Sequence, residues 1–311
     1  MRARLPQIDP VVGRLSLVHL LVDAYGNVYA PLVPLLIPRL HLSLLAAGTL
    51  AMLFQLAASV AQLGFGYLAD RWRPRLLVTA GPVVAVGLLS LAGLASSAAM
   101  LALVLVAGGL GTAAFHPSAA ALVHRLGGPR TGLAMSIYIT GGTLGFSFAP
   151  LVFAPLAERF GPASTAILAP PGLAAVLLLL RRLPEVETTA DPRAGGLRIL
   201  VPYARPLALL YLIVVLRTLT SIGFTVFVPV LLTARGLSAA EAGSVVALFL
   251  FASGIGGFFG GPAADRWGPR TVIIASLVAA APLLFLAPRL EGVWFALALA
   301  AGGFALQSTL P

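Results

Sequence analysis

The stretch GYLADRWRPR, at positions 66–75, decides the fold because the chain contains it twice. Its second copy, GPAADRWGPR at positions 261–270, keeps the pattern Asp-Arg-Trp-x-Pro-Arg at an offset of 195 residues. The same offset relates Pro34 and Pro229, Ser43 and Ser238, Gly48 and Gly243, and Phe54 and Phe249. Because charged, proline and tryptophan residues rarely repeat together at one offset by chance, the sequence predicts two similar halves.

The composition around these two stretches excludes a water-soluble protein. Of the 311 residues, 59% are hydrophobic and 10% are charged, and the mean hydropathy is +1.00. A soluble domain is about 45–50% apolar and about 25% charged, so this chain lacks the polar residues to cover its own surface. It contains no cysteine, which excludes disulfides, thiolate metal sites and cysteine nucleophiles.

Ten apolar runs are long enough to cross a bilayer as helices, which takes about 20 mostly apolar residues. They cover residues 15–37, 46–68, 76–95, 98–122, 132–155, 163–181, 206–232, 242–262, 271–288 and 293–311. The sequence therefore predicts an all-α polytopic membrane protein that contacts the lipid bilayer.

The arginines indicate the orientation. All 20 basic residues are arginine. With a cytoplasmic N-terminus, fifteen of them fall in inner segments, four in outer loops and one, Arg217, inside a span. Inner segments of membrane proteins carry such an excess, so we expect a multi-pass protein of the cell (inner) membrane with its N-terminus in the cytoplasm. The net charge of +10 then reflects topology, and no nucleic-acid partner is expected.

The repeat and the spans together divide the chain. Residues 1–182 are expected to form a six-helix N-terminal bundle, residues 183–205 a cytoplasmic linker, and residues 206–311 a second bundle of four helices. Pro117 in the fourth span matches Pro311 at an offset of 194, so we expect the second bundle to be incomplete after its fourth helix. Duplicated bundles are typical of secondary transporters, which bind substrate between them.

Residues 66–75 resemble the loop signature G-x-x-x-D-R-x-G-R-R of the major facilitator superfamily, with Arg73 in place of a glycine that the second copy keeps as Gly268. Other motifs are similar to its fosmidomycin-resistance branch of drug-efflux transporters: His19 and Asp23, Phe54-Gln55-Leu56, Phe115-His116-Pro117, and Gly141-Gly142-x-x-Gly145 with Pro150. The resemblance implies the major facilitator fold and export of a compound in exchange for protons.

The resemblance also implies a conformational latch, in which Asp70 and Asp265 hold the cytoplasmic side closed by pairing with helix N-termini of the opposite half. Its residues would be Gly66, Asp70, Arg71, Arg75, Gly261, Asp265, Arg266 and Arg270. The other interpretation is a solvated charge cluster, which contributes little to stability. Gly141, Gly142 and Gly145 resemble the antiporter motif of efflux members, but small residues at this spacing also let helices pack closely.

Few ionisable residues lie inside the spans, where charge is costly and usually functional. His19, Asp23 and Asn27 fall on one face of a helix, and His19 and Asp23 can touch because they are four residues apart. Histidine titrates near neutral pH, so this pair either exchanges protons or is a structural hydrogen-bonded pair. The resemblance places His116 in the same cavity, facing Asp23; a lone histidine is otherwise more often a core residue.

Arg217 and Ser221 lie on one stripe of the seventh span. A guanidinium group suits carboxylate, phosphate or phosphonate groups, so Arg217 can anchor an anionic substrate. It can also be a counter-ion for Asp23, or extend its charge toward the membrane surface.

The leading hypothesis is a monomeric, proton-coupled transporter that exports small organic compounds or drugs, anionic ones included, by alternating access. Its partners are then the small-molecule substrate, protons and lipid, and we expect no cofactor and no metal. The alternatives are a proton symporter that takes up a small organic anion, an inactive truncated carrier, and an intramembrane enzyme that uses His19, Asp23 and His116. We do not expect an enzyme, because the chain has no nucleophile motif.

Overall fold

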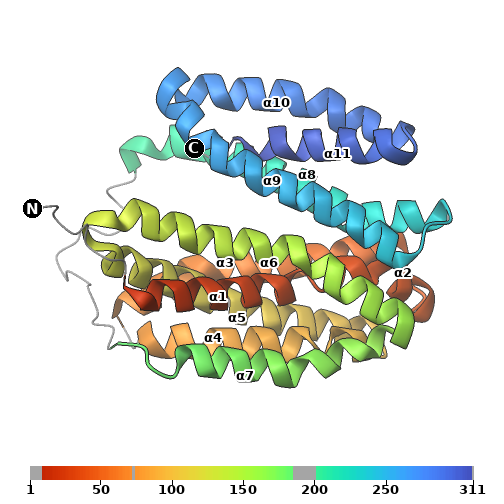
Figure 1. The fold of residues 1–311 in the computed structure, drawn as a ribbon, viewed down its shortest axis with the longest axis horizontal. Helices are drawn as coiled ribbons and strands as arrows, with labels where there is room; N and C mark the ends of the chain where they lie inside the picture. The colour runs from red at the N-terminus through yellow and green to blue at the C-terminus, as the bar shows by residue number, and fades with distance from the viewer. Residues whose placement is uncertain (1–8, 72–73, 185–200, 310–311) are drawn as a thin grey trace, which may run out of the picture.

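The computed structural model describes residues 9–71, 74–184 and 201–309, and over these ranges the regular elements are helices, with no strand (Figure 1). The first half holds α1 (Pro10–Gly26), α2 (Tyr29–Arg39), α3 (Leu44–Arg71), α4 (Pro74–Leu89), α5 (Ala98–Gly127), α6 (Thr131–Phe160) and α7 (Ala169–Leu180). The second half holds α8 (Ala204–Ala234), α9 (Ala239–Trp267), α10 (Pro269–Leu286) and α11 (Gly292–Gln307). Most of the predicted linker, Arg73 and Pro311 lie outside the described residues, and so does the side chain of Asp70.

The predicted all-helical membrane fold is confirmed. In the described part of the chain, eight continuous helical stretches are long and apolar enough to cross a membrane. The longest, Ala98–Phe160, contains both α5 and α6, joined by the short turn η2 (Gly128–Arg130). The apolar helix α11 is shorter, at 16 residues. Within the described residues each predicted span falls mostly on helix, and the ends differ by a few residues because several helices continue into the charged segments.

The first predicted span, 15–37, differs from the structure because it is two helices rather than one. The chain breaks at Asn27 and Val28, between α1 and α2. Pro31 explains the break, because a proline cannot donate a hydrogen bond to the carbonyl four residues earlier, which is that of Asn27. Within the first turn of α2, the missing N–H of Pro31 costs no helical hydrogen bond.

Helix ends follow local capping rules. The Asp9 carboxylate accepts a hydrogen bond of 2.8 Å from the Val11 N–H at the start of α1, and Ser97 caps α5 by accepting from the Met100 N–H. Helix α9 starts with a capping box, in which the Ser238 side chain and the Glu241 carboxylate each accept a hydrogen bond from the other residue's backbone N–H. Such caps satisfy amides that have no partner within the helix.

The buried apolar side chains form two main clusters. The larger joins residues from Val11 to Val226 and is built by α1–α7 with part of α8. The second runs from Val228 to Leu306 and is built by α8–α11. In the first cluster α1 packs on α6, while α3 and α4 pack on α5; in the second, α9 and α10 pack on α11. The division of the chain at residues 182 and 206 remains a prediction.

The two halves contact each other mainly at one end. We call the end where the chain enters α1 the N-terminal end, and the end where α6 finishes and α9 begins the far end. At the far end α2 packs on α8 and α9, and α6 packs on α9. Toward the N-terminal end the α6 and α9 ribbons diverge (Figure 1). A Cβ built at Gly261, near the end of α9, would meet no atom of the described residues within 4 Å.

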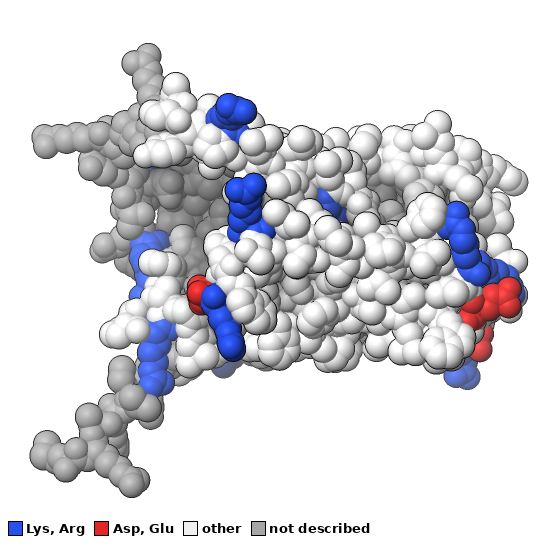
Figure 2. Space-filling view, turned by 90° about the horizontal axis from the view of Figure 1, so that it is seen from above, with Lys and Arg blue, Asp and Glu red and all other residues white. Residues whose placement is uncertain are grey.

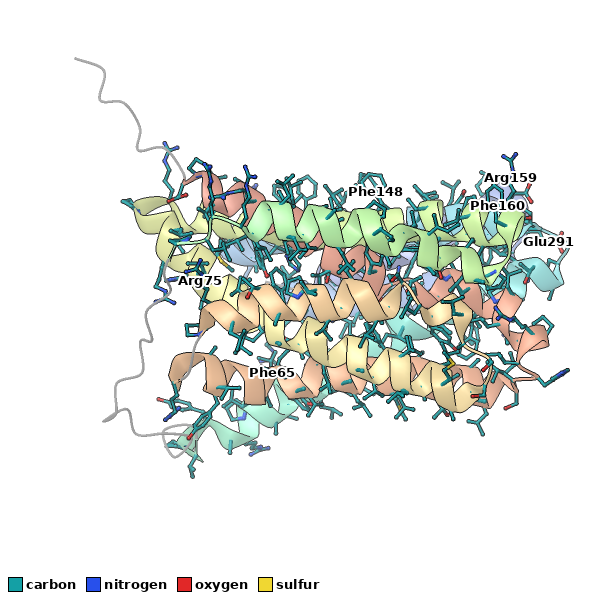
Figure 3. All side chains as sticks on the ribbon, turned by 90° about the horizontal axis from the view of Figure 1, so that it is seen from below. Phe65, Arg75, Phe148, Arg159, Phe160 and Glu291 are labelled. Carbon is teal, nitrogen blue, oxygen red and sulfur yellow. The ribbon has the colours of Figure 1, made fainter. Side chains whose placement is uncertain are left out.

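The surface is mostly apolar between two charged ends. In the face shown in Figure 2, arginines and acidic residues gather toward the ends and the region between them is largely uncharged. Figure 3 places Arg75 at the N-terminal end, Arg159 and Glu291 at the far end, and Phe148 between them. Leu63 is 80% exposed and Phe258 is 64% exposed. Such a belt is the surface that a lipid-embedded protein presents, in agreement with a multi-pass membrane protein.

Candidate functional site

Three ionisable side chains from two helices meet in the first half. His19 and Asp23 lie on α1, and His116 lies on α5. The distance from His19 Nε2 to Asp23 Oδ2 is 3.2 Å, and that from His116 Nε2 to Asp23 Oδ1 is 3.1 Å. The two Nε2 atoms are themselves 3.1 Å apart. We call these three residues the triad; His19 and Asp23 are buried, and His116 is partly exposed.

Helix α6 fixes the orientation of the His19 ring. His19 Nδ1 lies 2.8 Å from the carbonyl oxygen of Tyr138, and because a carbonyl only accepts, Nδ1 carries the hydrogen and donates it. The Tyr138 ring stacks on the His19 ring at a centroid distance of 4.1 Å and an angle of 25°. The remaining nitrogen, Nε2, is thereby directed at Asp23 and His116.

The hydrogen bonds of the triad depend on which ring nitrogens carry protons. A carboxylate only accepts hydrogen bonds, so each imidazole that bonds Asp23 must hold a hydrogen on Nε2. His19 already donates from Nδ1, so it bonds Asp23 fully only as an imidazolium ion. The Nδ1 atom of His116 is buried and has no hydrogen-bond partner in the described part of the chain. The arrangement can therefore hold one proton more than two neutral imidazoles do.

Three glycines bring α6 against α1 and the triad. A Cβ built at Gly141 would overlap the Ser16 carbonyl, and one at Gly145 would overlap the Leu20 carbonyl. A Cβ at Gly142 would lie 2.5 Å from both Asp23 Oδ2 and His19 Nε2. Glycine is therefore required at 142 for the triad to exist in this form, which sequence analysis did not recognise.

Tyr138 is a site residue that sequence analysis missed. It is buried, and its hydroxyl has no hydrogen-bond partner among the described residues. A usable signal was the spacing of Tyr138, Gly142 and Gly145, which places them on one face of α6. Asn27, which the sequence placed on the same face as His19, lies at the α1–α2 break and donates a 3.0 Å hydrogen bond to the Phe146 carbonyl.

The structure does not join Arg217 to the triad. Arg217 Nη1 donates a 2.8 Å hydrogen bond to Gln307 Oε1, which links α8 to α11. Within the described residues no salt bridge connects Arg217 with Asp23; the carboxylate is paired with the two histidines. Ser221, one turn further along α8, is partly exposed and its carbonyl accepts a hydrogen bond from the Thr225 hydroxyl. Gln307 was not singled out from sequence.

The expected latch residues lie at the N-terminal end. Gly66 approaches Pro117, since a Cβ at 66 would lie 3.7 Å from the proline Cβ. The Arg71 guanidinium lies 3.8 Å from the centroid of the Tyr67 ring. Asp265 is exposed, and no salt bridge joins it to another described residue. Arg75, Arg266 and Arg270 are also exposed.

The far end has a carboxylate–helix contact of its own. Glu158 Oε2 on α6 accepts a 2.8 Å hydrogen bond from the Ala240 N–H in the first turn of α9. Next to it, Gly243 of α9 lies against the Pro150 carbonyl and the Ala154 methyl group, because a Cβ at 243 would be 3.0 Å and 2.8 Å from them. The two halves are thus in backbone contact here.

The comparisons with known proteins agree on one family. The model of the Major Facilitator Superfamily matches residues 15–217 and 210–311. The chain is 29% identical to the fosmidomycin resistance protein of Escherichia coli (strain K12), over 96% of this chain and 75% of that protein. It is 30% identical to the uncharacterized MFS-type transporter YfnC of Bacillus subtilis (strain 168), over 90% of this chain and 71% of that protein. A bacterial homologue of the human lysosomal transporter Spinster, solved inward-facing and unoccupied, superposes with a TM-score of 0.78 at 20% identity, over 99% of this chain and 74% of the other.

Proposed function

Because the chain belongs to the major facilitator superfamily, we propose that it is a proton-coupled secondary transporter that exports small organic compounds by alternating access. As a member of this family it is a membrane transporter and not an enzyme. The proposal covers three points beyond family membership. They are exchange of the compound for protons, the identity of the compound and the direction of transport.

The observation that carries the proposal is the triad. A charged group inside a membrane protein is costly unless it is paired, and among the described residues Asp23 pairs with two side chains that can release a proton. The carboxylate, the two imidazoles and the orienting Tyr138 carbonyl form a site at which one proton is held or released while the fold stays intact. Proton exchange at such a site couples transport to a proton gradient when each state of the carrier exposes it to a different side.

The arrangement of the halves supports an alternating-access cycle. They touch at the far end and diverge at the N-terminal end (Figure 1). With the N-terminus in the cytoplasm, as the arginines predict, this is the inward-open state. His116 is the most exposed member of the triad, with 20% of its side chain accessible. We infer that the triad exchanges its proton with the cytoplasm in this state.

The transported compound is proposed to be a drug-like organic molecule, anionic ones included. The similarity to a fosmidomycin resistance protein supports drug export. Arg217 supports an anionic group, because its described partner is the neutral amide of Gln307 and its positive charge remains available. A guanidinium group whose charge is not neutralised binds a carboxylate or phosphonate through two parallel hydrogen bonds.

Everted membrane vesicles that contain the chain, acidified inside by respiration, test this proposal. Addition of an exported compound should release protons from the vesicles, and a pH-sensitive dye reports the loss of the gradient. Asp23→Asn should abolish this release while the protein still reaches the membrane, because the amide keeps the shape but not the charge. Glu291→Gln, which changes an exposed carboxylate at the far end, should behave like the parent.

Two results would contradict the proposal. Retention of compound-dependent proton release in Asp23→Asn would remove the triad from coupling. Entry of the compound together with protons, in place of exchange, would favour the symporter.

A further inference from the structure

We propose that His19, Asp23 and His116 form a three-ligand binding site for a divalent transition-metal ion of the Zn²⁺ class, with a fourth coordination position left open. From the sequence we expect no metal, and the two histidines are far apart in the chain. The fold brings them together with one carboxylate, and their ligand atoms lie within 4.8 Å of one another. The proposal goes beyond transport, since it holds whatever the chain carries and whether or not protons drive it.

The separations between the ligand atoms fit a tetrahedral ion. Zinc binds imidazole nitrogen at about 2.0–2.1 Å and carboxylate oxygen at about 2.0–2.2 Å, so two ligands of one tetrahedron lie about 3.3–3.5 Å apart. In the triad the two Nε2 atoms are 3.1 Å apart. His116 Nε2 lies 3.1 Å from Asp23 Oδ1, and His19 Nε2 lies 3.2 Å from Asp23 Oδ2. The two imidazole nitrogens need to spread by only a few tenths of an ångström to share the ion, and the carboxylate presents one oxygen to each of them.

The surroundings of His19 are those of a metal ligand. Its Nδ1–H donates to the Tyr138 carbonyl, and this outer hydrogen bond leaves Nε2 as the ligating atom and fixes the ring. The stacked Tyr138 ring further restricts rotation. Gly142 completes the enclosure, because any side chain at 142 would overlap His19 and Asp23. The site is therefore held in place before an ion arrives.

The ligand set selects the class of ion. Two imidazoles and one carboxylate suit Zn²⁺, Co²⁺ and Ni²⁺, whereas Mg²⁺ and Ca²⁺ prefer oxygen ligands. A bound cation would also satisfy the nitrogen and oxygen atoms that converge in the triad, in place of the hydrogens that they otherwise share. The open position should lie on the side of His116, whose side chain is 20% accessible against 10% for His19 and Asp23.

The test uses the full chain, purified in detergent without a polyhistidine tag. Co²⁺ alone is the first probe, because its visible absorption reports a tetrahedral site, and Zn²⁺ is titrated in calorimetry as the second. We expect one equivalent of either ion per chain. Asp23→Asn and His116→Gln should each weaken binding at least tenfold. The control is the double variant His41→Gln with His124→Gln, which changes the two exposed histidines and should bind like the parent.

Several results would overturn the inference: no saturable binding to the parent chain, unchanged affinity in both triad variants, or loss of binding in the control. Because the parent and the control keep the triad intact, they decide the matter even if a triad variant fails to fold. Metal binding without compound-dependent proton release would contradict the proposed function alone, and proton release without metal binding would contradict this inference alone.

Discussion

Glu158 of α6 accepts a 2.8 Å hydrogen bond from the backbone N–H of Ala240 in the first turn of α9. The bond ties the first half of the chain to the second at the far end. A carboxylate at this position also interacts favourably with the partial positive charge of the helix N-terminus. The resemblance implies this kind of pairing for Asp70 and Asp265 at the N-terminal end, and that remains a prediction. The contact of Glu158 lies at the opposite end.

Removing the Glu158 carboxylate should loosen the far end. One such interaction contributes about 1 kcal/mol, which corresponds to about a fivefold change in the ratio of closed to open conformations. Because the chain has no cysteine, spin labels can be placed at Phe160→Cys and Ser244→Cys alone, two exposed positions on α6 and α9. In the Glu158→Ala background, pulsed electron paramagnetic resonance should show a larger population of molecules in which the two spin labels are far apart.

The matched control for that experiment is Glu291→Ala, which removes an exposed carboxylate at the same end (Figure 3). It should leave the distance distribution of the labelled parent unchanged. An identical distribution in Glu158→Ala would show that the bond does not hold the far end closed.

Gly142→Ala should damage the triad, whereas Gly132→Ala on the same helix should not. A methyl group at 142 would lie 2.5 Å from two triad atoms, but one at 132 would meet no atom within 4 Å in the part of the chain that the structure describes. Forced overpacking costs about 1–3 kcal/mol, while a compatible glycine-to-alanine change stabilises by about 0.4–1 kcal/mol. Thermal unfolding in detergent and the proton-release assay should both separate the two variants. Equal behaviour would mean that α6 does not approach the triad this closely.

Tyr138→Phe should be as stable as the parent or more stable. The His19 hydrogen bond goes to the backbone carbonyl of residue 138 and survives the change, while the buried hydroxyl that is lost has no described partner. A buried unsatisfied group costs about 1–3 kcal/mol. Tyr138→Ala should be less stable than either, because it removes the ring that stacks on His19. A lower melting temperature for Tyr138→Phe would show that the hydroxyl has a partner.

The sequence predicts the membrane-spanning helices well, because each of them is visible as a run of about 20 apolar residues. The break at Asn27 was foreseeable from Pro31, but the apolar run continues past it and hides it. The spacing of His19 and Asp23 gives their contact directly, since i,i+4 neighbours share a helix face.

The rest of the site depends on how different helices pack. His116 reaches Asp23 only because α5 and α1 lie together, and nothing in the spacing of the two residues encodes this. Two residues that the sequence did not single out are Tyr138 and Gln307. They lie in helices that are apolar on every side, where the hydrophobic period identifies no inner face. Glu158 is hidden for another reason, because a charge at a helix end looks like an ordinary loop residue.

The break at Asn27 places a joint inside the first span, only one helical turn from Asp23. Helix α1, before the joint, holds two members of the triad, while α2, after it, packs against α8 and α9 of the second half. Asn27 is tied on the α1 side, where its N–H donates to the Asp23 carbonyl at 3.0 Å. Because α2 also packs against α6 of the first half, a displacement of α8 and α9 would act on α2 and on the joint, one helical turn from the Asp23 carboxylate.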